Sequence, residues 1–260
     1  MGYLEPMKRR LKTPMMTATA GLLSLATFGF APRVHAAEQH LIYDLAVEGA
    51  AVGTREVTIK YYSRPSGERH VIETFTHLVA PGVTFDSRGT GLSTPSSAQF
   101  SSATDRNGSR SAVAARELPQ GGWQVTVQSG GKETDRNETE VRVSTLDLMD
   151  PARIALLDAP GSFGLIIAET GDTVVGTLST GEPGTVKIGG VRVPVTRYTL
   201  AGSGASARFM ISGDGLLVSS EVRWLGLDMV ATLRDLPAAR DYGVVETTEG
   251  LGSGVQEGDL

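Results

Sequence analysis

Residues 41–62, LIYDLAVEGAAVGTREVTIKYY, decide the fold class of this chain. Large apolar residues stand at every second position from Leu41 to Val47, and a period of two is typical of a strand with one buried face. Residues Gly49 to Gly53 predict a turn, after which the alternation resumes at Val57, Ile59 and Tyr61. Two alternating segments joined by a glycine turn indicate an antiparallel hairpin.

The same pattern recurs along most of the chain. Turns rich in glycine, proline, asparagine or aspartate separate the segments, for example Arg64-Pro65-Ser66-Gly67 and Gly213-Asp214-Gly215, because proline presets φ and glycine tolerates a positive φ. The further segments that predict strands are 70–79, 123–127, 141–143, 173–178, 185–188, 191–200, 205–211, 216–225 and 228–234. Most of them follow one another through short turns, which predicts consecutive hairpins.

One helix is expected to interrupt the strands. Asp150-Pro151 is a start signal, since aspartate caps the free amides of a helix and proline fits its first position. Residues 152–157 continue the helix, and Ala159-Pro160-Gly161 ends it. The short apolar run at 164–168 is then a linker or a strand that enters the second half of the chain.

These elements predict a mainly β protein, an antiparallel meander that forms a curved open sheet or an incomplete barrel with one short helix. A sheet of ten or more strands curls or closes to limit its exposed edges, and the helix is expected to lie against the concave side or to plug one end. Two small β domains, divided near residues 150–165, are the alternative. The glycine content, 32 of 260 residues, agrees with a chain of many turns.

The N-terminal segment predicts export. A basic cluster at residues 8–12, an uncharged run from Met15 to Ala31, and small residues at Val34 and Ala36 are the three parts of a secretory signal peptide. We therefore expect residues 1–36 to be a cleaved signal peptide rather than an anchor helix. Residues 37–246 then form a single β-rich domain, and residues 247–260 form a flexible acidic tail.

The predicted location is periplasmic or secreted, with no transmembrane span after signal cleavage, because no other segment is long and apolar enough. The pair Arg9-Arg10 leaves both the general secretory and the twin-arginine routes open.

Signal cleavage changes the charge of the protein. Residues 1–36 contain five of the 24 basic residues and one of the 29 acidic residues, so the remaining chain has 19 basic and 28 acidic residues and a formal charge of −9. Nucleic-acid binding needs clustered lysine and arginine, and this composition excludes it. The same charge disfavours adsorption to anionic lipid surfaces.

Several kinds of chemistry are excluded by composition and motifs. The absence of cysteine excludes disulfides, thiolate metal sites, a cysteine nucleophile and a lipid-modified cysteine. No Gly-x-Ser-x-Gly elbow occurs, and the glycine-rich stretch 202–207 lies between two predicted strands, so it is interpreted as a hairpin turn rather than a dinucleotide site. The acidic loops at 105–109 and 135–140 are interpreted as Asx-type turns rather than calcium sites. No cofactor and no metal site are predicted.

Four residues are the first to test for ligand binding. Glu73 and His77 face the same side of one predicted strand, where they suggest either an acid–base or metal site or a solvated strand face. Residues four apart in a strand lie about 13 Å apart, so the two do not touch directly. Trp123 and Trp224 stand on valine-rich strand faces, which favours a core position. If the sheet curls, the same faces can hold an acyl chain.

Two hairpins carry a resemblance to known families. Residues 43–54 followed by 57–59, and residues 208–218, resemble the opening and closing hairpins of uncharacterised exported bacterial families. The resemblance implies an open, curved β-sheet similar to that of the periplasmic lipoprotein carriers, and an envelope location. These families have no assigned function, so the resemblance implies no catalytic residues.

The leading functional hypothesis is an exported, non-catalytic β-rich envelope protein that binds a lipid or another apolar ligand in the concave face of its sheet. The alternative is a structural or interaction module of the cell envelope, and a hydrolase is the third class. A continuous apolar pocket above about 300 Å³ favours the first class, and a filled interior favours the second. Convergence of Glu73 and His77 with an aspartate or serine in one cleft favours the third.

Overall fold

A computed structural model describes residues 36–64, 67–158, 162–179, 181–202, 206–224 and 227–237. The predicted signal peptide, apart from its last residue, and the predicted acidic tail lie outside the described residues. Within the described ranges, sixteen strands belong to one sheet, and the helical structure consists of two short 3₁₀ segments. No helix in the described part of the chain is long and apolar enough to cross a membrane.

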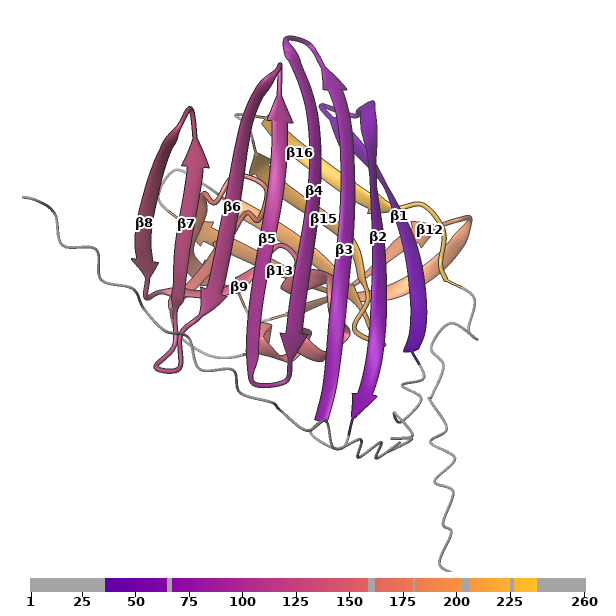
Figure 1. Ribbon diagram of the computed structural model, residues 1–260. Coiled ribbons are helices and arrows are strands. Elements are labelled where there is room, and N and C mark those ends of the chain that lie inside the picture. The colour runs from indigo at the N-terminus through magenta and orange to yellow at the C-terminus, as the bar shows by residue number, and fades with distance from the viewer. Residues whose placement is uncertain are drawn as a thin grey trace, which may run out of the picture. The chain divides into compact units, whose positions relative to one another are not determined.

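The first eight strands form a continuous antiparallel meander, in which each strand pairs with its neighbours in sequence. We call this half of the sheet the N-terminal arm (Figure 1). Its strands are β1 (Ala36–Val47), β2 (Ala50–Arg64), β3 (Gly67–Ala80), β4 (Val83–Thr94), β5 (Ser97–Arg106), β6 (Ser109–Glu117), β7 (Trp123–Ser129) and β8 (Lys132–Glu138).

The remaining strands form the C-terminal arm, which joins the first arm where β16 pairs with β1. From there the order is β16, β15, β14, β13, β11, β10 and β9, and β12 pairs with β13 beside this path. The strands are β9 (Val141–Ser144), β10 (Ser162–Ile166), β11 (Thr173–Leu178), β12 (Glu182–Ile188), β13 (Val191–Gly202), β14 (Ser206–Ser212), β15 (Leu217–Trp224) and β16 (Leu227–Leu233).

The predicted curved, incompletely closed sheet is confirmed. Strands β8 and β9 are the two ends of the strand order, and within the described residues no ladder joins them, so the barrel stays open. One departure from a pure meander is the parallel pair of β9 and β10. The segment at 164–168, which the sequence left as a linker or a strand, supplies most of β10.

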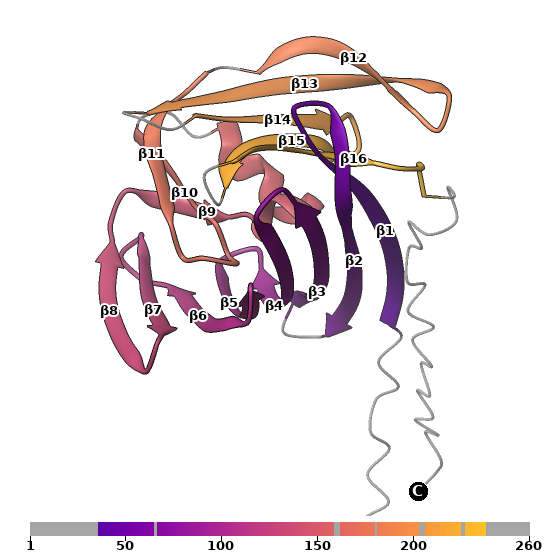
Figure 2. The same cartoon turned by 90° about the horizontal axis from the view of Figure 1, so that it is seen from above.

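The two arms face each other across one main core. Figure 2 shows β13–β16 as one layer, the N-terminal arm as another, and the helical segment between them. Buried residues of both arms belong to the same hydrophobic cluster, among them Tyr43 and Phe85 of the first arm and Phe163 and Phe209 of the second. The largest side chains of this cluster are fully buried.

The hairpin predicted from residues 41–62 is confirmed, but its turn is shorter than expected. The turn consists of Glu48 and Gly49, both with positive φ, while Gly53 lies inside β2 beside an irregular register at Leu45. A Cβ atom at Gly53 would lie 2.0 Å from the carbonyl oxygen of His77 on β3. Gly53 is therefore required by the close approach of a neighbouring strand rather than by the turn.

The helix predicted from Asp150 is confirmed in position but has 3₁₀ geometry. It comprises η1 (Asp147–Met149) and η2 (Pro151–Asp158). The expected cap is present, since the backbone N–H of Ala152 donates to the Asp150 carboxylate at 3.0 Å. Leu148, Met149 and Leu157 enter the main core, so the segment lies on the concave side of the sheet.

Four strands of the N-terminal arm, β4, β5, β6 and β8, were not predicted. The inward positions of β4 and β5 include Ser87, Gly89, Ser102 and Thr104 instead of large apolar residues, so the usual alternation is missing. Strand β8 is almost entirely polar and exposed. These segments are strands because they pair with neighbouring strands that have a clear apolar alternation, since propensity for β structure depends on context.

Candidate functional site

The concave interior is largely filled. Residues 144–158, which we call the inner segment, lie between the two arms (Figure 2). A cavity lined by described residues of both arms and the inner segment has a volume of about 30 Å³, which holds one or two water molecules. Its lining is apolar except for Arg55, Thr145, Glu169 and Ser220.

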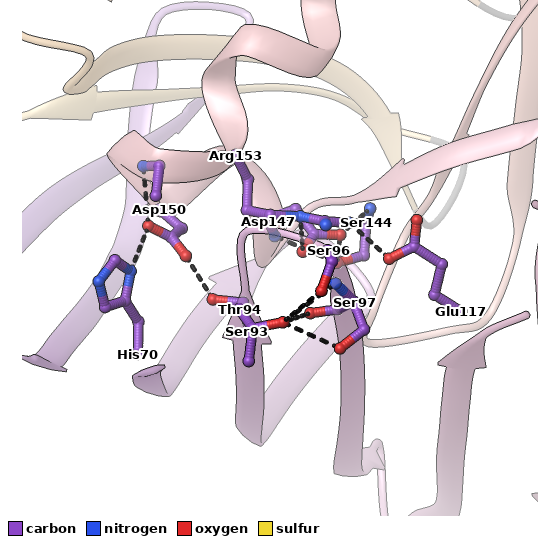
Figure 3. A network of polar contacts seen from close by, with 11 residues as sticks. His70, Ser93, Thr94, Ser96, Ser97, Glu117, Ser144, Asp147, Asp150 and Arg153 are labelled. Carbon is purple, nitrogen blue, oxygen red and sulfur yellow. Dashed lines mark hydrogen bonds and ion pairs between the residues drawn. The ribbon is translucent and has the colours of Figure 1, made fainter. Parts of the chain in front are cut away.

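Three buried polar clusters surround this interior. The first joins β3, β4 and the start of η2 (Figure 3): His70 Nδ1 lies 2.8 Å from Asp150 Oδ1, and the Ser93 hydroxyl donates to the other oxygen of the same carboxylate. All three residues are buried. The Asp150 carboxylate also caps η2 by accepting the Ala152 N–H. Three groups, from His70, Ser93 and Ala152, therefore surround this one buried carboxylate.

The charge state of this cluster is set by competing effects. Burial raises the pKa of Asp150, but hydrogen bonds from His70 and Ser93 outweigh burial and hold the pKa below its usual value. Burial also lowers the pKa of His70, but its hydrogen bond and attraction to Asp150 raise the pKa above the usual 6.5. At pH values below neutral, a negatively charged Asp150 therefore pairs with a positively charged His70.

The connectivity of this cluster does not match that of a catalytic triad. In a triad, histidine accepts the proton of the serine and the aspartate orients the histidine. Here the Ser93 hydroxyl donates to Asp150 and not to His70, so the histidine is not placed to take the proton of the serine. The arrangement positions chain segments rather than a nucleophile.

The second cluster holds the other side of the inner segment. The buried Arg153 guanidinium lies 2.9 Å from Glu117 on β6 and 3.4 Å from Asp147 (Figure 3). Asp147 also accepts hydrogen bonds from the backbone N–H and the hydroxyl of Ser144, at 2.7 and 2.9 Å. Burial raises the pKa of Asp147 to about 6, against the opposing effects of Arg153 and Ser144.

The third cluster lies at the remaining cavity. Arg55 on β2 forms a buried ion pair with Glu169 from the β10–β11 loop and donates to the Thr76 hydroxyl at 3.0 Å. The Thr104 hydroxyl donates to the Glu169 carbonyl at 3.0 Å. The Ser102 hydroxyl donates to the Ala168 carbonyl at 2.6 Å. Two of the small polar residues that made β5 hard to predict from the sequence, Ser102 and Thr104, thus bind this loop.

Glu73 and His77 lie on the outer face of β3 and are not brought together. Each pairs across to a different strand: Glu73 accepts from Lys60 at 2.9 Å, and His77 Nδ1 lies 2.7 Å from Asp86. Their side chains are 48% and 50% exposed. The structure thus places them in two separate solvent-facing pairs.

The two tryptophans have different outcomes. Trp123 is completely buried in a second cluster under β5–β7, 5.7 Å from the Phe100 ring. It is a core residue. Trp224 ends β15, where it pairs with Leu227 of β16, and its side chain lies outside the described residues.

The residues of the buried clusters were not predicted as a site from the sequence. Asp150 was identified only as a helix cap, and its partners His70 and Ser93 are 80 and 57 residues away in sequence. Arg55 and Glu169 are 114 residues apart. The local signal in the sequence was the run of serine, threonine and glycine residues at 87–104, between segments that alternate like strands.

The described residues contain no group of three or more histidine or acidic side chains placed to hold a metal ion. Of the two acidic stretches interpreted as Asx-type turns, 105–109 contains the β5–β6 turn, in which the Gly108 N–H donates to Asp105 at 2.8 Å. The interpretation of 135–140 is wrong in its first part, because residues 135–138 belong to strand β8. Asn107 and Gly108 both have positive φ, which suits a tight hairpin turn.

A pH dependence follows from Asp147. Because its folded-state pKa of about 6 exceeds the usual 3.8, ionisation destabilises the fold, and the stabilisation present below about pH 4 is lost as pH rises through 6. Relative to Asp147→Asn, the wild type should lose up to about 3 kcal/mol of unfolding free energy between pH 4 and pH 7. Urea unfolding of both proteins at several pH values measures this difference.

The matched control is Asp44→Asn, because Asp44 forms an exposed pair with Arg234. The unfolding free energy of Asp44→Asn should stay within about 1 kcal/mol of the wild-type value between pH 4 and pH 7. If the unfolding free energies of the wild type and Asp147→Asn changed in parallel with pH, the raised pKa of Asp147 would be contradicted.

The chain is similar to the crystal structure of a beta-barrel-like protein of domain of unknown function DUF1849 from Brucella abortus, with a TM-score of 0.49 and 14% identity. The similarity covers 78% of this chain and 98% of that chain. No family model matches the chain, and no curated protein gives a significant match.

Proposed function

We propose that this chain is an exported, non-catalytic interaction module of the cell envelope that works through the surface of its sheet. The observation that carries the proposal is the packed interior, where the cavity that the described residues line between the arms has a volume of about 30 Å³. Ligand pockets for small molecules have volumes of about 300–1,000 Å³. An interior that is packed and joined by hydrogen bonds and ion pairs keeps the outer surface rigid, which favours a function at that surface.

The buried charges support the same proposal, because each has a structural partner. Asp150, Asp147 and Glu169 are paired with His70, Arg153 and Arg55, respectively. The pairs of Asp150 with His70 and of Arg153 with Glu117 bind the inner segment to the N-terminal arm, and the pair of Glu169 with Arg55 binds the β10–β11 loop to it. Buried charges that hold a chain in place are a structural device, whereas catalytic groups are aimed at a space where substrate can sit.

Export is supported by the sequence. The basic, apolar and small-residue parts of residues 1–36 match a secretory signal. Without cysteine, the protein in an oxidising compartment is held together by its core, hydrogen bonds and ion pairs and not by disulfides.

Binding of a lipid or another apolar ligand in the concave face is the second candidate. The observation that favours it is the character of the small cavity, in which Met149, Phe209 and Met229 surround the Arg55–Glu169 pair. Methionine side chains adapt readily to new neighbours, and an arginine can pair with an anionic head group. An acyl chain would nevertheless have to displace part of the inner segment.

Native mass spectrometry of the protein purified from its own envelope, combined with lipid extraction, separates the two candidates. An interaction module gives the mass of the protein without ligand, beginning near Ala37, and a melting temperature that is unchanged across a lipid panel. A lipid bound at one per protein, with a raised melting temperature, would overturn the module and support the second candidate. Recovery of the uncleaved chain from the cytoplasm would contradict export.

A further inference from the structure

The outer face of the N-terminal arm is hollowed where it crosses β3–β8. These strands lie in front in Figure 1. Two adjoining depressions lie there, with volumes of about 1,090 and 760 Å³, and both are lined in part by Glu133. We call them together the outer groove. Unlike the interior cavity, the outer groove has room for a ligand.

The groove is hollow because its floor consists of small residues. Outward positions in the middle of β5 are Ser101 and Ala103, and they stand opposite Ala114 and Ala112 of β6. The ends of the same strands carry longer outward side chains, for example Asp105 opposite Arg110. Small residues in the centre and long ones at the ends leave a depression across the strands.

A row of opposed residues crosses the groove from β3 to β8. Arg88 on β4 stands opposite Ala103, which is followed by Ala112, Gln128 and Glu133 in the successive strands. Opposed residues of an antiparallel pair face the same side of a sheet. The row therefore has a cation near one end, a carboxylate at the other and mainly small residues between them.

The two charges at the ends of the row are available to a partner. Arg88 lies 5.5 Å from the centre of the Phe75 ring, and within the described residues it has no carboxylate at ion-pair distance. Glu133 accepts a hydrogen bond from Gln128 at 2.6 Å and has no basic partner in the same ranges. In contrast, the acids near Arg88, Asp86 and Asp105, are paired with His77 and Arg110.

We propose that the outer groove binds an extended peptide segment of a partner protein that carries an acidic and a basic side chain six residues apart. Four strand spacings separate β4 from β8, or about 19 Å, and six residues of extended chain cover about 20 Å. Residues at positions i, i+2, i+4 and i+6 of such a segment face the same side. The acid then meets Arg88, the base meets Glu133, and two medium apolar side chains fill the space above the alanines.

This inference rests on the proposed function, since it names the partner class of an interaction module. The probe is the fluorescein-labelled peptide acetyl-Glu-Ser-Val-Ser-Val-Ser-Lys-amide, and binding to the mature protein is measured by fluorescence anisotropy. We expect saturable binding. Arg88→Glu should weaken it about tenfold, as repulsion replaces attraction. Ala103→Trp should abolish it by filling the floor.

A charge-reversal test links the effect to Arg88. A second peptide, in which lysine replaces the glutamate, should bind the wild type about tenfold more weakly than the first peptide. The Arg88→Glu variant should prefer the second peptide. The matched control is Ala201→Trp, which adds the same side chain at an exposed position of β13 outside the groove and should leave binding unchanged.

Several outcomes overturn the inference. They are the absence of saturable binding by the wild type, equal binding by Ala103→Trp with an unchanged melting temperature, and no change of preference in Arg88→Glu. Binding of a chitooligosaccharide or of anionic vesicles that is lost in Ala103→Trp would assign the groove to another partner. That result would overturn the peptide while leaving an interaction module in place, whereas a stoichiometric lipid in the interior would overturn the module itself.

Discussion

Replacement of Arg153 by methionine is expected to lower the free energy of unfolding by about 3–5 kcal/mol, because removal of one partner leaves buried charges without compensation. The Arg153 side chain is 2% exposed and lies between Glu117 and Asp147. Methionine preserves most of the packing volume, so the loss measures the charge. Denaturant unfolding followed by circular dichroism gives the value.

Two further substitutions test whether the loss of stability comes from the buried charges. Combined with Arg153→Met, Asp147→Asn removes one of the uncompensated carboxylates and should recover part of the loss. Arg208→Met removes the arginine of an exposed pair with Glu221 and should cost less than about 1 kcal/mol. If Arg153→Met were as mild as Arg208→Met, the second cluster would not anchor the inner segment.

Replacement of Trp123 by alanine is expected to lower the unfolding free energy by about 3–5 kcal/mol, the range for deletion of a large buried aromatic side chain. Trp123 is fully buried against Phe100 in the second hydrophobic cluster. Its indole N–H has no hydrogen-bond partner among the described residues. The loss therefore comes from packing and the cavity left behind.

The matched control is Phe75→Ala, which truncates an aromatic residue that is 38% exposed on the outer face. Its cost should be less than half that of Trp123→Ala in the same denaturant experiment. A wild-type-like stability for Trp123→Ala, together with lost binding of an apolar ligand, would instead make Trp123 part of a ligand site.

Much of the fold was predictable where strands carry large apolar residues on one face. The hairpin at 41–62 and the hairpin that includes residues 208–218 are present as expected. The strands on either side of the stretch 202–207, which was interpreted as a hairpin turn, are antiparallel, since Ala201 pairs with Ser206. In these segments, local pattern and tertiary environment favour the same structure.

The candidate site was much less predictable. The inward side of β4 and β5 faces the inner segment and the β10–β11 loop, whose backbone needs hydrogen-bond partners. Serine and threonine at these positions supply them, as Ser102 and Thr104 do. A serine that binds a distant carbonyl looks the same in the sequence as a serine in a loop, so these strands and their partners stayed hidden.

The sequence by itself determined the class of the fold, because periodic burial and turn chemistry are local properties. It also determined the start of the helical segment at Asp150 and the absence of disulfides. Only the tertiary structure decided that the interior is filled, that His70, Ser93 and Asp150 meet, and that the outer face of β3–β8 is hollow. Those features depend on strand register and on contacts between residues far apart in the chain, and a one-residue shift of register would reverse every inward and outward side chain.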